Sequence, residues 1–365
     1  MNDRRTSPLA AALLAWFQSH RRALPWRERR TPYATWISEI MLQQTQVKTV
    51  IPYFRRWMER FPDAQAVARA SRDEILKHWE GLGYYSRAAN IHETARILAD
   101  RFQGHLPRDH KALLGLPGIG PYTAGAVMSM AFNEPFAVVD GNVERVFARL
   151  FNIEKPVKER EARRFIHGTA QGLLPPGKAG AFNEALMELG ALVCTPKNPS
   201  CSSCPVALHC ESLRQGVVEQ RPVTTPRKPT TALQVAAGVL VRDGRIFVQK
   251  RPPDGLMPNL WEFPGGKLEN GESPEEALVR EFREELELSI QCLDPIMVVR
   301  HSYTVFRVTL HAFFCRLSPP DQTPVLRAAV DLRWATPREL DRLAFPAANA
   351  KLIRKMQKEG WLDPS

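Results

Sequence analysis

The 365-residue sequence predicts a multidomain protein in which an all-α domain is followed by an α+β domain. Apolar residues recur at helical spacing through most of residues 1–220, whereas residues 232–365 open with short, strand-like apolar runs. Residues 221–231, RPVTTPRKPTT, combine proline, threonine and basic residues without an apolar face, which is typical of a linker. The length suffices for two domains of ordinary size.

The net charge of +11 is unevenly distributed along the chain. Residues 1–220 carry +8 and the linker carries +3, while residues 232–365 carry 0. The first domain and the linker therefore favour a polyanionic partner such as nucleic acid, although a basic protein with a solvated surface has the same balance. No run of 18 apolar residues occurs and the N-terminal segment lacks a convincing signal-peptide cleavage site, so we expect a cytoplasmic protein without a membrane partner.

Residues 8–20 and 33–50 are predicted to form the first two long helices. Within the second, Glu39 lies between apolar positions and is followed by the amide-rich run Gln43–Gln46. A lone glutamate on an amphipathic helix is usually a solvated charge. A purely structural helix would more often carry Lys or Glu than these amides, so Glu39 is a candidate functional residue. Further helical patterns occupy residues 51–61, 63–80 and 87–102.

Two glycine-containing turns are candidate nucleic acid contacts. Residues 81–88, GLGYYSRA, predict a turn with an exposed pair of tyrosines, which beside a basic surface can stack on bases; an ordinary turn with packed rings is the alternative. Residues 116–120, LPGIG, predict a hairpin between two helices. Its glycines expose backbone N–H groups, and the helix starting near Pro121 favours phosphate at its N-terminus.

Asp140 follows a short apolar run and precedes Gly141 and a helix. This position predicts a helix cap. Because the N–H groups and the dipole of a helix start favour the charged form, we expect Asp140 to be ionised at neutral pH.

Four of the six cysteines lie in one loop, CTPKNPSCSSCPVALHC. They are Cys194, Cys201, Cys204 and Cys210. Four thiolates can bind zinc or an iron–sulfur cluster, and two disulfides are disfavoured in a reducing compartment. Zinc sites usually pair two short C-x2-C knuckles, whereas here one such knuckle has arms of six and five residues.

The α+β domain opens with a predicted hairpin at residues 234–251, turning at Asp243-Gly244. A helix is predicted at residues 274–286, with Glu281, Glu284 and Glu285 sharing one neighbourhood. An acidic solvated face is the simpler reading, but a divalent cation among these carboxylates would relieve their repulsion. Strands at 296–317 and 325–335 and helices at 337–343 and 349–358 complete the prediction.

Residues 8–213 resemble the MutY-type adenine DNA glycosylases of the helix-hairpin-helix superfamily. The resemblance rests on WISEIMLQQTQV, GLGYYSRA, LPGIGPYTAG, VVDGNVERV and the cysteine loop, which occur in family order. It implies an all-α helix-hairpin-helix glycosylase fold with an iron–sulfur loop, and it favours a [4Fe–4S] cluster over zinc at the four cysteines.

The resemblance also implies catalytic roles. Glu39 resembles the general acid that protonates the flipped adenine at N7, and Asp140 resembles the carboxylate that stabilises the oxocarbenium-like sugar. Asn142 and Tyr122 would position the sugar and the acid. Tyr122 stands where related bifunctional enzymes carry a Schiff-base lysine, so a monofunctional enzyme is expected. The chemistry agrees, since adenine leaves as a neutral group and the developing cation needs a negative charge nearby.

The same resemblance assigns DNA contacts. Gln44 and Tyr84 look like the wedges that fill the gap left by the flipped base and offset the cost of unstacking. Leu116, Gly118 and Gly120 belong to the hairpin that would bind the DNA backbone.

The second domain resembles the Nudix fold of the 8-oxo-dGTP hydrolase MutT. The matching positions are Gly266, Glu272, Arg280, Glu281, Glu284 and Glu285. The pattern departs at Glu287, where the motif has glycine. By this resemblance Glu281, Glu284 and Glu285 would bind Mg²⁺ weakly, and Asn349 would contact 8-oxoguanine. Thr304 stands in the place of the lesion-reading loop of the MutY-type enzymes and is a second candidate contact.

We therefore expect a monofunctional DNA glycosylase that removes adenine mispaired with 8-oxoguanine or guanine in double-stranded DNA. It would act in base excision repair as a nucleoid-associated monomer. One alternative is a Nudix-type 8-oxo-dGTP pyrophosphohydrolase tethered to a DNA-binding domain. A lesion-binding protein with inert enzyme sites is another.

Overall fold

The computed structural model describes residues 6–225, 230–303 and 306–362, without the side chains of residues 302 and 303. The chain forms two compact units. The first comprises Met1–Arg69 with Glu93–Pro226, and the second comprises Ala70–His92 with Arg227–Ser365. Residues 70–92, which the sequence predicts as part of the helical domain, group by their contacts with the C-terminal part of the chain. No described helix is both long enough and apolar enough to span a membrane.

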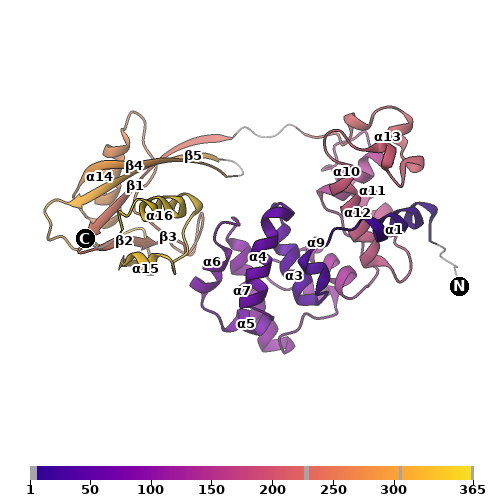
Figure 1. Cartoon of the computed structure of the whole chain (residues 1–365), viewed down its shortest axis with the longest axis horizontal. Helices are drawn as coiled ribbons and strands as arrows, with labels where there is room; N and C mark the ends of the chain where they lie inside the picture. Colours follow the sequence, from indigo (N-terminus) through magenta and orange to yellow (C-terminus); the bar gives the residue numbers. More distant parts are fainter. Residues whose placement is uncertain (1–5, 226–229, 304–305, 363–365) are drawn as a thin grey trace. The chain divides into compact units, whose positions relative to one another are not determined.

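The first unit is helical (Figure 1). Its helices up to residue 131 are α1 (Pro8–His20), α2 (Pro25–Glu28), α3 (Pro32–Leu42), α4 (Val47–Arg60), α5 (Ala64–Arg69), most of α7 (Ser86–Phe102), α8 (His110–Leu114), α9 (Pro121–Ala126) and the π-helix η1 (Val127–Ala131). The remaining ones are α10 (Gly141–Leu150), α11 (Arg160–Gly172), α12 (Ala179–Leu192) and α13 (Glu211–Arg214), with the 3-10 turns η2 (Cys201–Ser203), η3 (Ala207–His209) and η4 (Val218–Gln220).

Local sequence signals explain where several of these helices begin. Ser7, Thr31 and Asp140 each accept a backbone hydrogen bond as N-caps of α1, α3 and α10. Proline occupies the first position of α1 and α3, where its missing N–H costs nothing. The predicted helix 33–50 is wrong in one respect. It breaks after Leu42, because Gln44 adopts a left-handed conformation (φ 57°), and α4 starts at Val47.

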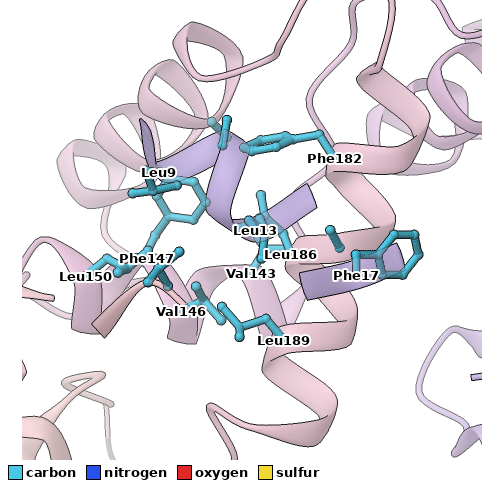
Figure 2. Packing of buried hydrophobic residues seen from close by; sticks show 14 of the residues in the cluster. Leu9, Leu13, Phe17, Val143, Val146, Phe147, Leu150, Phe182, Leu186 and Leu189 are labelled. Carbon is cyan, nitrogen blue, oxygen red and sulfur yellow. The ribbon is translucent and has the colours of Figure 1, made fainter. Parts of the chain in front are cut away.

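The first core lies among α1, α10 and α12 (Figure 2). Each helix contributes apolar residues from one face at three- and four-residue spacing. The labelled residues are Leu9, Leu13, Phe17, Val143, Val146, Phe147, Leu150, Phe182, Leu186 and Leu189. Their packing fixes α10 against α12, so that residues at the start of α10 and on α12 can line one site.

The second unit is an α+β fold with a six-stranded mixed sheet (Figure 1). Its strands are β1 (Thr231–Arg242), β2 (Arg245–Lys250), β3 (Trp261–Glu262), β4 (Ile290–Tyr303), β5 (Phe306–Leu317) and β6 (Asp331–Ala335), in the order β3-β2-β1-β5-β4 with β6 paired to β2. Its helices are α6 (Arg72–Trp79), the start of α7, α14 (Pro274–Leu286), α15 (Pro337–Leu340) and α16 (Ala347–Lys358).

Helices cover both faces of this sheet. Successive side chains of a strand point to opposite faces. Along β1, Ala236 and Leu240 join the cluster that contains α14, while Ala237 and Val239 join the cluster that contains α16. The predicted hairpin is present: β1 ends at Arg242, β2 starts at Arg245, and both turn residues have positive φ, as a type I′ turn requires.

Candidate active site

Glu39 is buried on the apolar helix α3. Tyr122, in the first turn of α9, donates a hydrogen bond from its hydroxyl to Glu39 Oε2 at 2.8 Å. Burial raises the pKa of Glu39 to about 7; the bond from Tyr122 opposes this, and the nearby Asp140 carboxylate adds to it. A carboxyl with such a pKa can hold a proton near neutral pH and release it to a base.

Asp140 caps helix α10, as the sequence predicts. Its Oδ1 accepts a hydrogen bond from the Val143 N–H at 2.8 Å, and its Oδ2 accepts one from Asn142 Nδ2 at 2.8 Å. Burial raises the pKa of Asp140 above its usual value, whereas the hydrogen bonds and the Arg145 guanidinium hold it down. The stabilising effect of the cap on the charged carboxylate was predicted from the sequence, whereas the burial of Asp140 was not.

One cavity of about 650 Å³ brings these groups together. Glu39, Tyr122, Asp140 and Asn142, all predicted catalytic residues, line it. Gln44 lines it as well, from the irregular segment between α3 and α4. The structure thus places an acid of raised pKa and a capped carboxylate on one space large enough for a small ligand.

Sequence reasoning missed a charged network on the wall of this cavity. Glu188 accepts hydrogen bonds from Arg22 and Arg27, and Glu184 accepts from Arg27 and Arg30, all at 2.7–3.1 Å. Burial alone would raise the pKa of Glu188, but the arginine bonds lower it to about 2. The available signal was the pair of glutamates four residues apart in AGAFNEALMELGAL, since uncompensated charges are rarely buried in so apolar a helix.

A chain of polar contacts links Asp140 to the cysteine loop. Asn142, which donates to Asp140, accepts from Arg145 Nη2 at 2.9 Å. Arg145 Nε donates in turn to the Cys194 carbonyl oxygen at 2.8 Å. The position of the carboxylate and the conformation of the loop are therefore coupled through two side chains.

The four loop cysteines line a single small cavity. The buried Arg149 donates from Nη1 to Cys194 Sγ at 3.3 Å and also holds the loop carbonyls of Thr195 and Pro196. Burial raises the pKa of the Cys204 thiol to about 11. Among the described residues no three metal-ligating side chains converge on a point that would suit one ion. Four thiols that line one cavity are soft ligands of the kind that suits zinc or an iron–sulfur cluster.

In the hairpin at residues 116–120, the large apolar side chains are buried and the glycines are exposed. Leu116 and Ile119 are buried, whereas Gly118 and Gly120 are exposed. Gly118 has φ 73°, which favours glycine, and Gly120 is the N-cap of α9. Leu116, predicted as a DNA contact, therefore anchors the hairpin by its side chain, and the glycines present the backbone.

In the second unit the predicted exposed tyrosine pair is half wrong. Tyr84 is 44% exposed, but Tyr85 is only 5% exposed, because its ring packs inside and its hydroxyl bonds to the backbone. Only Tyr84 presents its ring to solvent.

The acidic helix α14 holds its own cation. Arg280 forms ion pairs with Glu272, Glu281 and Glu284 at 2.9–3.1 Å, and Gln249 donates to Glu285 at 3.0 Å. The repulsion that the sequence analysis assigned to a metal ion is thus relieved by a guanidinium. Glu287 ends the helix in the left-handed conformation that glycine usually adopts and pairs with Arg327.

Of the two residues of this unit predicted to contact the lesion, the structure describes Asn349. Asn349 is buried, and its Oδ1 accepts the Phe263 N–H at 2.9 Å, so its carboxamide oxygen is engaged inside the fold. Thr304 lies outside the described residues.

Comparisons with known proteins match two family models, and the first of them includes residues 70–92, which the fold groups with the second unit. Residues 37–170 match the HhH-GPD superfamily of base excision DNA repair proteins, and residues 236–355 match the NUDIX domain. A human adenine DNA glycosylase is 35% identical over 95% of this chain and 73% of its own length. One from Buchnera aphidicola subsp. Baizongia pistaciae is 33% identical over 88% and 95%.

A solved structure supports the helical part. A thermostable thymine-DNA glycosylase superposes with a TM-score of 0.53 at 31% identity, covering 56% of this chain and 95% of its own. The two family models and the adenine DNA glycosylase relatives together cover both parts of the sequence. The chain belongs to the adenine DNA glycosylase family and is a DNA glycosylase of base excision repair.

Proposed function

We propose that the protein hydrolyses the N-glycosidic bond of adenine mispaired with 8-oxoguanine or guanine in double-stranded DNA. The observation that carries this proposal is the shared cavity of Glu39 and Asp140, with burial raising the pKa of Glu39 to about 7. Cleavage of this bond needs a proton on the leaving base and a negative charge near the developing sugar cation.

Each side chain then has one task. Glu39 gives its proton to the ring nitrogen of the extruded adenine, and the Tyr122 hydroxyl holds the carboxyl in place from 2.8 Å. Asp140, oriented by Asn142 and by the Val143 N–H, faces the sugar as its positive charge develops. No lysine occurs among the described residues that line the cavity, so water rather than an enzyme amine would complete the reaction. This supports a monofunctional glycosylase.

Base extrusion needs side chains that fill the vacated space. Gln44, in left-handed conformation at the cavity, and the exposed ring of Tyr84 suit this role. The exposed backbone at Gly118 and Gly120 suits phosphate.

We further propose that Cys194, Cys201, Cys204 and Cys210 hold a [4Fe–4S] cluster. When bound, the cluster would tie the loop into one rigid element through its four thiolates. Arg149 would stabilise the thiolate of Cys194 by the bond it already makes to that sulfur. Protein prepared without oxygen should contain about four iron atoms; stoichiometric zinc without iron would contradict this proposal.

The catalytic assignment is tested by Glu39→Gln. The amide keeps the shape of the side chain but cannot supply the proton, so the single-turnover rate on an A:8-oxoguanine duplex should fall by about 10²–10⁴ while duplex affinity changes little. Glu59→Gln, on the exposed face of α4, is the matched control and should retain full activity. Near-normal cleavage by Glu39→Gln would rule out the assignment.

A further inference from the structure

The loop that presents Tyr84 is held in a demanding conformation. Gly81, Gly83 and Tyr84 all have positive φ, at 100°, 72° and 48°. For the glycines this is inexpensive, but a tyrosine in the left-handed region is retained only where its surroundings enforce it. The position of the Tyr84 ring therefore depends on the contacts that hold this loop.

Two neighbouring residues of the same segment, Trp79 and Arg87, hold the backbone of the loop at Leu82 and Gly83. The Gly83 carbonyl accepts from Trp79 Nε1 at 3.0 Å and from Arg87 Nη2 at 3.1 Å. Arg87 also donates to the Leu82 carbonyl, and its guanidinium lies 5.2 Å from the centre of the Trp79 ring and 5.5 Å from that of Tyr84. The Tyr84 ring thus rests on a cation supported by a buried indole.

The two ends of the loop are held by Phe345, which lies in a distant part of the sequence. The Tyr85 hydroxyl accepts from the Gly81 N–H at 3.3 Å and donates to the Phe345 carbonyl at 3.2 Å. The Phe345 N–H donates to Glu80 Oε1 at 3.3 Å. The residues on either side of Gly81–Tyr84 therefore bond to the N–H and the C=O of one residue.

Phe345 is a rigid partner. Its side chain is fully buried in the cluster of the second unit and stacks on Phe263 with ring centres 6.0 Å apart. Lys77 reinforces the junction by donating to the Leu343 carbonyl at 2.9 Å while pairing with Glu80 at 2.5 Å. Lys250 and Asp73 add an ion pair at 2.7 Å. Segment 343–345 of the Nudix-like fold is thus a fixed support beneath the loop.

We propose that Tyr85 is a positioning residue for DNA recognition: its hydroxyl couples the Nudix-like fold, through Phe345, to the Gly81–Tyr84 loop and so fixes the ring of Tyr84. This inference rests on the proposed role of Tyr84 as an inserted side chain. It gives the Nudix-like fold a task in mispair recognition that requires neither nucleotide hydrolysis nor a direct contact with the base.

The test uses the full-length protein and four variants. Tyr85→Phe removes only the hydroxyl, Glu80→Gln weakens the second anchor, and Tyr84→Ala removes the ring itself. Tyr33→Phe is the matched control, because the Tyr33 hydroxyl is also buried and donates to a backbone carbonyl, that of Phe61, at 2.8 Å. It removes the same chemical group outside the loop.

The measurements are the Kd for an A:8-oxoguanine duplex with a non-cleavable adenosine analogue, and the rate constant and amplitude of single-turnover cleavage at saturating enzyme. Losing one such bond weakens an equilibrium about 2- to 12-fold. Tyr85→Phe should raise the Kd by about 3- to 10-fold with a rate constant within twofold of wild type, and Glu80→Gln should act in the same direction. Destabilisation alone, as expected for Tyr33→Phe, would lower the amplitude and leave the Kd unchanged.

Amide hydrogen exchange of residues 81–84 without DNA separates the positioning role of Tyr85 from the insertion role of Tyr84. Exchange should increase in Tyr85→Phe and stay unchanged in Tyr33→Phe. If Tyr84→Ala weakens binding but Tyr85→Phe changes neither the Kd nor the exchange, the positioning role is wrong and the insertion role stands. If Tyr84→Ala leaves the Kd unchanged, the insertion role of Tyr84 is wrong. The proposed effect of Tyr85 on DNA recognition is then wrong as well, even if hydrogen exchange shows that Tyr85 orders the loop.

Discussion

The raised pKa of Glu39 predicts that stability and catalysis share one pH dependence. In the unfolded chain Glu39 titrates near 4.5, and in the folded protein burial raises its pKa to about 7. Below pH 4.5 the residue is neutral in both states and contributes nothing. Between 4.5 and 7 only the unfolded state loses the proton, so stability falls as pH rises, and above 7 the full cost remains.

The magnitude follows from the two pKa values. One pKa unit corresponds to about 1.4 kcal/mol, so the step from 4.5 to about 7 costs about 3 kcal/mol of unfolding free energy at pH 8. Glu39→Gln removes the titration. The variant should be more stable than wild type by up to about 3 kcal/mol at pH 8, and this advantage should vanish below pH 4.5.

Catalysis should depend on the same proton. Because the acid acts in its neutral form, the single-turnover rate of wild type should be level below pH 6 and fall about tenfold per pH unit above 7. Denaturant unfolding from pH 4 to 9 and single-turnover cleavage over the same range measure the two profiles, with Glu59→Gln as the control. A flat rate from pH 6 to 9, together with a stability difference independent of pH, would refute the reasoning.

Three further predictions concern the rest of the molecule. Phe147→Ala should destabilise the protein by about 3–5 kcal/mol in denaturant unfolding, because the ring is fully buried, whereas Phe165→Ala, half exposed, should cost far less. Arg149→Met should lower the iron content per protein, measured by elemental analysis, because it removes the donor to Cys194 Sγ; unchanged iron would count against that contact. Arg280→Gln should make thermal stability more responsive to magnesium than wild type, because Glu272, Glu281 and Glu284 lose their cation; equal responses would argue against an ion at these glutamates.

Sequence reasoning succeeded where chemistry and local pattern coincide. Glu39 and Asp140 were identifiable because a carboxylate in an apolar helix and a carboxylate at a helix start are each conspicuous. The hairpin at Asp243-Gly244 and helix α14 were identifiable from turn residues and from apolar residues at four-residue spacing. These features depend on neighbours in the sequence.

The errors concern information that lies elsewhere in the chain. The break at Gln43–Gln46 was missed because the apolar spacing continues through it. Tyr85 and Asn349 resemble exposed functional residues in sequence, yet their partners Phe345 and Phe263 are far away along the chain. The same holds for the arginine partners of Glu184, which precede it by more than 150 residues.

The grouping of residues 70–92 with the C-terminal part has a consequence for biosynthesis. The bond from Lys77 to the Leu343 carbonyl spans 266 positions in the sequence. At a synthesis rate of about 5–20 residues per second, the ribosome needs roughly 13–53 s to make the second partner after the first. Throughout that interval α6 and the Tyr84 loop have emerged without the segment that supports them. The second unit, which contains both segments, must therefore remain incomplete until translation of the chain is nearly finished.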